Sequence, residues 1–200
     1  PLLRKMKHYI RKMYRDEPLL NPEYPKIINE KHFNRLKKML LEQDGEIITG
    51  GRMDADTLKI EPTLLAGLTG RSKVMQEEIF GPVLPVFAYS DLAEVIRILQ
   101  KKEKPLALYL FTRNSRVKKT VISKVSFGGG CINDTIIHLS NEKLPFGGAG
   151  NSGMGAYHGK HSYETFSREK SIMEKGNWLD IPFRYPPYGK RLPLLKKLLK

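Results

Sequence analysis

Four residues that lie close together in the sequence have the side chains of a covalent catalytic site: Cys131, Asn133, Asp134 and His138. A thiol becomes a good nucleophile when an imidazole takes its proton and a third polar group orients the imidazole. The same cysteine follows three glycines and lies in an apolar stretch, where cysteine is commonly a small buried hydrophobic residue. These residues therefore favour a structural cysteine, with a nucleophile as the alternative.

The histidines do not have the spacing of metal ligands. No HExxH-like pattern is present, and a single cysteine excludes a zinc site built from cysteines. We therefore predict no bound metal at any of the histidines, which are His8, His32, His138, His158 and His161.

A pair of acidic residues precedes an aromatic residue and a Gly-Pro turn in the run EEIFGP, residues 77–82. A carboxylate such as that of Glu78 can accept hydrogen bonds from a ribose, while a ring such as that of Phe80 packs against a flat heterocycle. Adjacent carboxylates are more often simply solvated. From the spacing alone, the solvated interpretation is favoured.

Glycine is concentrated in the segment 144–159, which contains Phe146. Glycine allows the backbone to approach a ligand, a partner or another strand closely. The segment lacks the Lys-Ser/Thr pair of a P-loop, and a dinucleotide-binding turn would have to lie between a strand and a capped helix. A constrained loop that shapes a cleft is therefore favoured over a phosphate site.

The residues from 83 to 133 have the pattern of alternating strands and helices. Short apolar runs predict buried strands, and amphipathic stretches predict helices between them, capped by Ser90 or Asp91 and by Asn114. Crossover helices of this length join parallel strands. The chain is therefore predicted to have an α/β fold with a parallel sheet, whose strands are Val83–Tyr89, Leu106–Thr112 and Phe127–Asn133.

Two helices are predicted in the N-terminal part of the chain. Apolar residues recur at helical spacing from Leu2 and again from about Asn29. Gly45 is predicted to end the second helix with a left-handed cap.

A β-hairpin is predicted after these helices. Gly50 and Gly51 form a dipeptide that favours a tight turn between strands at 46–49 and 57–65. Pro62 cannot donate a ladder hydrogen bond, so it confines the second strand to an edge or a bulge.

The composition is that of a water-soluble chain. Hydrophobic residues make up 40% and charged residues 28% of the 200 residues, and the mean hydropathy is -0.41. No unbroken apolar run is long enough to cross a bilayer as a helix. The single cysteine excludes an internal disulfide framework and favours a reducing compartment, so we expect a cytoplasmic location.

The formal charge of +14 is concentrated at the two ends of the chain. Residues 1–40 hold 11 Lys and Arg against 4 Asp and Glu, and residues 181–200 hold 6 against none, so the centre is nearly neutral. A nucleic-acid groove would spread basic residues among stacking aromatics, and no known nucleic-acid-binding pattern is present. We predict no nucleic-acid partner.

Three motifs occur in the order found in aldehyde dehydrogenases, a family that the chain resembles. They are EEIFGP from Glu77, GGCIND from Gly129 and LPFGG from Leu144. The chain is similar to the class 3, fatty-aldehyde-type branch in three further segments: Gly150–Gly155, Tyr157–Gly159 and Phe183–Tyr188.

The resemblance implies NAD- or NADP-dependent oxidation of an aldehyde to a carboxylic acid. In this chemistry a cysteine thiolate attacks the carbonyl, hydride passes to the nicotinamide, and water hydrolyses the thioester. In the family the nucleophile precedes the EEIFGP run by a long helical stretch, which places it before Pro1 and not at Cys131. The resemblance therefore implies a C-terminal part of the enzyme that holds no catalytic residue and is inactive alone.

The resemblance also assigns three binding residues. Glu78 would accept hydrogen bonds from the nicotinamide ribose, and Phe80 would pack beside the nicotinamide ring. Phe146 would line the aldehyde channel with an apolar wall.

By the same resemblance the chain has three parts. Residues 1–165 would be the C-terminal portion of a parallel-sheet catalytic domain of the aldehyde dehydrogenase fold, and residues 177–200 a C-terminal tail. Residues 166–176 would be a segment of the oligomerisation sheet, containing a strand at Ser167–Met173. That strand would pair across subunits, which implies a homodimer in the intact enzyme.

The last residues are short, basic and amphipathic. Leu192–Lys200 could pack against the protein, or residues 190–200 could make a weak contact with a membrane surface. The second case would give a peripheral membrane location instead of a cytoplasmic one. A different class of function is a basic binding or interaction module without catalysis, which would show salt-dependent binding through the charged ends.

Overall fold

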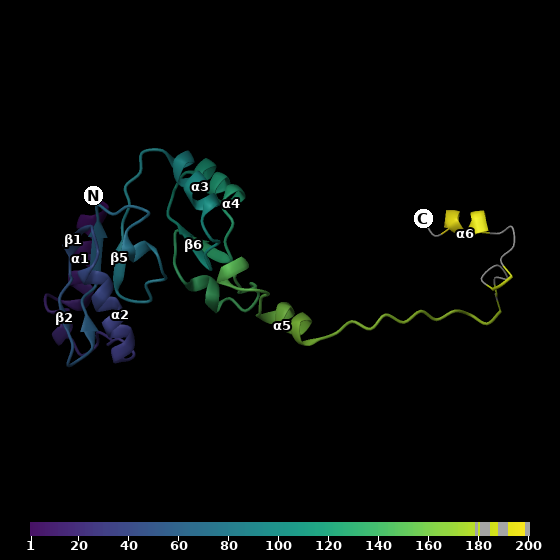
Figure 1. Cartoon of the computed structure of the whole chain (residues 1–200), viewed down its shortest axis with the longest axis horizontal. Helices are drawn as coiled ribbons and strands as arrows, with labels where there is room; N and C mark the ends of the chain where they lie inside the picture. Colours follow the sequence, from purple (N-terminus) through teal and green to yellow (C-terminus); the bar gives the residue numbers. More distant parts are fainter. Residues whose placement is uncertain (179, 181–184, 188–191, 199–200) are drawn as a thin grey trace. The chain divides into compact units, whose positions relative to one another are not determined.

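A computed structural model describes residues 1–178, 180, 185–187 and 192–198. The chain divides into two units, Pro1–Val95 and Ile96–Lys200, with the division inside helix α3 (Leu92–Lys101). The first unit contains a three-stranded sheet and a two-stranded ladder, and the second contains a two-stranded parallel ladder (Figure 1). Each unit is described separately below.

The two predicted N-terminal helices are confirmed as α1 (Leu2–Tyr14) and α2 (Glu30–Leu41). The Asn29 side chain caps α2 by accepting a hydrogen bond from the backbone N–H of His32. The predicted left-handed cap at Gly45 is wrong, because α2 ends at Leu41 and Gly45 does not have a positive φ. Gly45 is instead needed for packing, since a Cβ there would lie 2.5 Å from the carbonyl oxygen of Ala66.

A mixed sheet with the order β1-β4-β5 forms the centre of the first unit. β1 (Glu46–Thr49) pairs antiparallel with β4 (Thr63–Ala66), and β5 (Val83–Pro85) pairs parallel with β4. The predicted strand Val83–Tyr89 is therefore present in its first three residues. The prediction that it shares one parallel sheet with the strands at 106–112 and 127–133 is wrong, because its ladder partner is β4.

The predicted hairpin turn at Gly50-Gly51 is wrong. Pro62 interrupts the predicted strand 57–65, and its two halves pair with different partners. The first half, β3 (Lys59–Ile60), pairs with β2 (Met53–Asp54), while the second half becomes β4. Gly50 has a positive φ and lies so close to the Pro62 carbonyl that no side chain would fit there.

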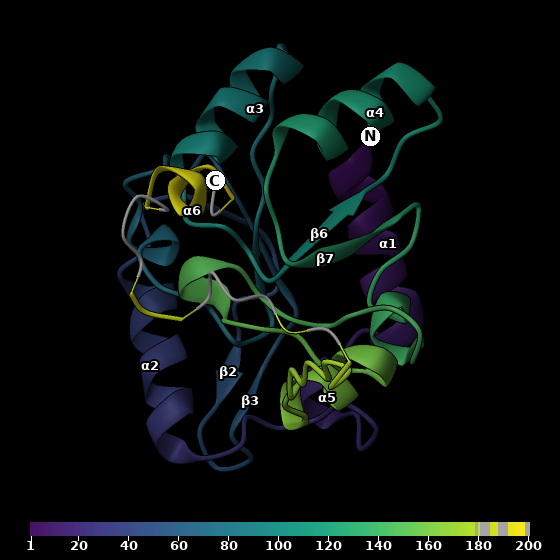
Figure 2. The ribbon, with the colours of Figure 1, turned by 90° about the vertical axis from the view of Figure 1, so that its right-hand side faces the viewer.

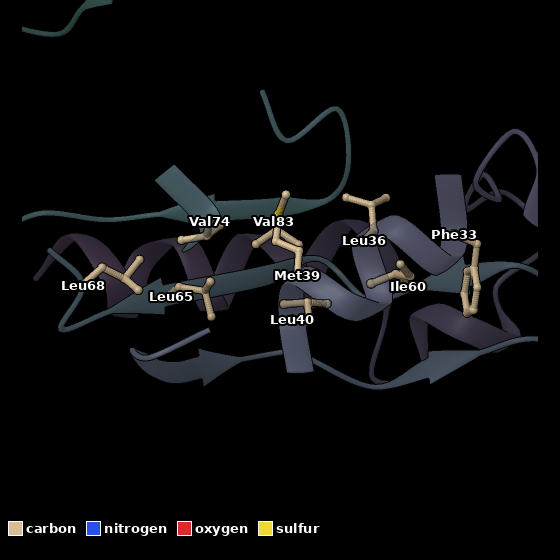
Figure 3. Close-up of a cluster of buried hydrophobic side chains, with 9 residues drawn as sticks. All are labelled: Phe33, Leu36, Met39, Leu40, Ile60, Leu65, Leu68, Val74 and Val83. Atoms are coloured by element: carbon tan, nitrogen blue, oxygen red, sulfur yellow. The ribbon is translucent and has the colours of Figure 1, made fainter. Parts of the chain in front are cut away.

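A hydrophobic core joins α2 to the strands of this unit (Figure 3). Its fully buried members include Phe33 and Leu36 of α2 together with Ile60 and Leu65 of the strands. The buried Tyr24 hydroxyl donates a hydrogen bond of 2.6 Å to the carbonyl of the core residue Ile60. Burial raises the pKa of the Tyr24 phenol well above its ordinary value, so this hydroxyl stays protonated and remains a donor.

The second unit contains the predicted parallel pair, in which β6 (Ala107–Leu110) and β7 (Gly129–Ile132) lie side by side (Figure 2). The helix between them is α4 (Ser115–Lys124), and the predicted cap at Asn114 is confirmed by its hydrogen bonds from two backbone N–H groups of the first turn. The Gln100 side chain of α3 donates to the backbone carbonyl of Lys124 at the end of α4.

The rest of the second unit is built from short elements. Three of them, which were not predicted, are the single-turn helices η3 (Ile137–Ser140) and η4 (Gly150–Ser152) and the helix α5 (Gly159–Phe166). Residues 167–176 have no strand partner among the described residues. A strand that pairs across subunits finds its partner in a second chain, so the oligomerisation strand stays a prediction.

The C-terminal segment contains α6 (Leu192–Leu198). The predicted family ending Phe183–Tyr188 and the predicted membrane contact at 190–200 lie partly outside the described residues. None of the helices in the described ranges is both long enough and apolar enough to span a bilayer.

Candidate functional site

Glu78 and Phe80 lie in one exposed loop of the first unit, between η2 (Lys73–Met75) and β5. The Phe80 side chain is 78% exposed, although phenylalanine is among the residues most often buried. Its φ is 45°, a left-handed conformation that costs a non-glycine residue about 1–2 kcal/mol. Strained backbone conformations cluster at active sites and ligand contacts, which makes Phe80 a candidate contact residue.

Packing against α2 fixes the end of this loop. A Cβ on Gly81 would lie 2.6 Å from both methyl groups of Leu36, a side chain that is completely buried. The absence of a side chain at position 81 therefore lets the residue after Phe80 rest directly on the core.

Cys131 and His138 are brought together in the second unit, as their spacing allowed. The Cys131 sulfur lies 3.5 Å from His138 Nδ1, and both residues line a cavity together with Gly130, Ser140 and Lys143. His138 is buried, and its Nε2 has no hydrogen-bond partner among the residues that the structure describes. An imidazole that serves as a base is normally oriented through its second nitrogen, and this contact is missing.

The other two members of the sequence cluster have different partners. The Asn133 side chain accepts a hydrogen bond from the Thr112 N–H and donates one to the Thr112 carbonyl, which ties the ends of β6 and β7 together. Asp134 accepts from the backbone N–H of the next residue, Thr135. Neither side chain is hydrogen-bonded to His138, so the geometry favours the structural cysteine over the nucleophile.

Phe146 is the centre of an aromatic cluster in the second unit. Its backbone exchanges two hydrogen bonds of 3.0 Å with Tyr157, and the two rings meet edge to face with centroids 5.6 Å apart. The rings of His138 and His158 lie 6.1 and 6.2 Å from the Phe146 ring. The half-buried Phe146 ring is thus held in place by neighbours on several sides, which suits a rigid apolar wall.

The glycines after Phe146 are used for contacts within the chain. A Cβ on Gly147 would lie 2.1 Å from the Gly155 carbonyl oxygen, and one on Gly148 would lie 2.1 Å from that of Ser152. The loop folds back tightly on itself, which agrees with the prediction of a constrained loop. Its closest backbone approaches are to its own chain, so these glycines are not needed to cradle a phosphate.

A groove of the first unit holds part of the N-terminal positive charge. Its described lining includes five basic side chains, Arg4, Lys7, Arg11, Arg15 and Arg52. Arg11 pairs with Asp16, and Arg52 pairs with both Glu17 and Glu61, whose hydrogen bonds raise the pKa of the Arg52 guanidinium. No Phe, Tyr or Trp is among the described lining residues, so the stacking platform of a single-stranded nucleic-acid site is lacking there.

In the part of the chain that the structure describes, no three His, Cys, Asp or Glu side chains gather into a metal-binding group. Of the sequence-predicted binding residues, Glu78 and Phe80 share one loop, and Phe146 joins an aromatic cluster of its own unit. The contacts of Phe146 with Tyr157 were not predicted. The sequence held a signal for them, because these two aromatic residues flank the glycine-rich run at residues 147–155.

The fold of the chain is mixed α/β, with a parallel strand pair in each unit. In open α/β sheets, ligands generally bind at the carboxyl ends of the strands. Over its full length the chain matches a solved structure of Staphylococcus aureus AldH in its substrate-bound state, with a TM-score of 0.87 and 44% identity, covering 43% of the AldH chain. Residues 2–172 match the model of the "Aldehyde dehydrogenase family". The chain belongs to this family of oxidoreductases and has part of its fold.

Two curated relatives are similar to almost the whole chain. A 4,4'-diaponeurosporen-aldehyde dehydrogenase of Staphylococcus aureus is 46% identical, and a rat aldehyde dehydrogenase that its name describes as dimeric and NADP-preferring is 42% identical. In both cases the match covers 96% of this chain and 42% of the relative. The chain thus spans about two fifths of their length. Aldehyde dehydrogenases use NAD or NADP as cofactor.

Proposed function

We propose that this chain is the C-terminal part of an enzyme that oxidises aldehydes to carboxylic acids with NAD or NADP. The similarity to the two relatives, which extends over nearly every residue of the chain, supports this proposal. We further propose that the nucleophilic cysteine lies before Pro1. The missing orienting group at His138 supports this placement, because Cys131 then lacks the arrangement of an activated thiol.

The loop at residues 77–82 carries the proposal on the cofactor. When bound, the nicotinamide would accept the hydride that leaves the substrate. Glu78 has an exposed carboxylate that can accept hydrogen bonds from the two ribose hydroxyls, and Phe80 offers a free ring face two residues further on. The left-handed backbone conformation of Phe80, which its surroundings must enforce, is the single observation that best supports this function.

Phe146 is proposed to line the aldehyde channel. Its ring is half-buried and braced by Tyr157 and His158, so it can exclude water from the substrate without moving. We also propose that the complete enzyme is a homodimer in the cytoplasm, paired through residues 166–176. A weak contact of residues 190–200 with a membrane surface remains the alternative location.

Replacing Glu78 with glutamine in the complete enzyme tests the cofactor site. We expect kcat at saturating aldehyde to fall about tenfold, because an amide replaces one of the carboxylate oxygens that hold the ribose and the nicotinamide is less well positioned. The measurement is the steady-state rate of NADH or NADPH formation. Glu103→Gln is a matched control, since Glu103 is also exposed and lies outside the loop at residues 77–82. Equal rates for the two variants would contradict the assignment of Glu78.

The 200-residue chain expressed alone is expected to show no aldehyde-dependent reduction of NAD or NADP, because we place the nucleophile outside it. The measurement is absorbance at the wavelength of the reduced nicotinamide, with the complete enzyme as the positive control. Turnover by the isolated chain that Cys131→Ser abolishes would overturn the proposed position of the nucleophile.

A further inference from the structure

We infer that Arg35 of α2 is a positioning residue for hydride transfer, acting through the loop that carries Glu78 and Phe80. This inference rests on the function proposed above. It concerns a residue that lies more than forty positions from that loop in the sequence.

The Arg35 guanidinium contacts three successive residues of the loop. Its Nη1 donates to the Glu77 carboxylate at 3.2 Å and to the Glu78 carbonyl at 3.4 Å. Its Nη2 donates to the Ile79 carbonyl at 2.5 Å. One rigid, planar group therefore orients two successive peptide planes and one side chain.

The contact with the Ile79 carbonyl bears directly on Phe80. This carbonyl belongs to the peptide plane that precedes the Phe80 Cα, so its direction helps to set φ at Phe80. The observed φ of 45° is unfavourable for phenylalanine and persists only when the surroundings enforce it. Arg35 supplies such a constraint from one side, and the packing of Gly81 on Leu36 supplies it from the other.

Arg35 is itself well anchored. It precedes Leu36, which is completely buried, and the Phe33 side chain one half-turn earlier is also buried. The Arg35 side chain is 27% exposed, whereas that of Glu77 is 54% exposed. An exposed ion pair contributes little, so we assign the positioning effect mainly to the hydrogen bonds with the two carbonyls.

Lysine could replace this function only in part. An ammonium group presents its donors around one point and cannot reach two separated carbonyls in the geometry of a guanidinium fork. Without the fork, Phe80 would sample other backbone conformations and the nicotinamide would lose one of its supports. A small displacement of a reacting group lowers the rate of the chemical step strongly.

The test is the single-turnover rate of NADH or NADPH formation by the complete enzyme, measured with an aldehyde that carries hydrogen or deuterium on its carbonyl carbon. We expect Arg35→Met to lower this rate about tenfold and to increase the deuterium isotope effect, with little change in the KM for the aldehyde. A role in stability alone would lower the amount of active enzyme without changing the isotope effect.

Lys38→Met is the matched control, because it removes one positive charge from the same helix at a residue that makes no contact with the loop carbonyls. It should behave as the wild type. If Arg35→Met does not fold, Arg35→Lys is measured instead, and a smaller change in the same direction is expected.

The outcomes separate the two proposals. Loss of rate in Glu78→Gln with wild-type rate and isotope effect in the Arg35 variant would overturn the positioning inference and leave the cofactor site standing. Wild-type behaviour of both variants would overturn the proposed cofactor site and this inference with it. Loss in both, with the larger isotope effect in the Arg35 variant, supports the inference.

Discussion

Gly130→Ala is expected to lower the free energy of unfolding by about 3 kcal/mol, the upper part of the range for inserting one methyl group into a packed site. A Cβ on Gly130 would lie 2.0 Å from the carbonyl oxygen of Leu108, its neighbour in the parallel ladder. This carbonyl is backbone and cannot turn aside as a flexible side chain would. The methyl group should therefore push β6 and β7 apart, and urea denaturation should detect the loss.

Gly70→Ala is the matched control for this prediction. It adds the same methyl group at a glycine that has no atom within 4 Å of the added carbon and has no positive φ. We expect a change of less than about 0.5 kcal/mol, as is usual for an unconstrained surface position. Equal stability of the two variants would show that β6 and β7 do not approach as closely as described.

Local signals predicted the helices α1, α2, α3 and α4, but not α5. Asn114 was recognisable as a cap, because its side chain accepts hydrogen bonds from N–H groups only two and three residues away. The cap at Asn29 was not predicted, although the same local contact forms it. The parallel pairing of β6 and β7 also followed from local features, since a helix of suitable length joins two apolar runs. These elements depend on contacts that the sequence displays within a short window.

Strand pairing in the first unit could not be predicted in the same way. β1 and β4 pair although two short strands lie between them in the sequence, and the choice is made by Pro62 and by burial of β4 in the core. Register is set where one face of a strand is buried, which depends on residues far away in the sequence. The dipeptide Gly50-Gly51 has the composition of a hairpin turn, but the chain uses it to pass close to Pro62.

The candidate site was predictable only where its residues are close together in the sequence. Cys131 and His138 are seven residues apart and meet, but the lack of a partner at His138 Nε2 emerges only from the folded packing. Arg35 had no signal at all in the sequence, where it is one of many basic residues of an amphipathic helix. The composition of the loop with Glu78 and Phe80 marked it as a candidate site. The residues that hold this loop in place, Arg35 and Leu36, had no such signal.

Leu36→Ala is expected to destabilise the protein by about 2–5 kcal/mol, the range for removing a completely buried leucine side chain. Leu36 belongs to the core cluster and also packs against Gly81. Leu41→Ala is the matched control on the same helix, since Leu41 is 68% exposed and should change stability by less than about 0.5 kcal/mol.

Combining Leu36→Ala with Gly81→Ala tests whether the core supports the loop at residues 77–82. Gly81→Ala alone should cost about 1–3 kcal/mol, because its methyl group would meet the Leu36 side chain at 2.6 Å. In the Leu36→Ala background the same methyl group enters the space that the leucine has left, so its cost should fall to near zero. The double-mutant cycle should then give a coupling energy of at least about 1 kcal/mol, whereas additive effects would show that Gly81 does not rest on Leu36.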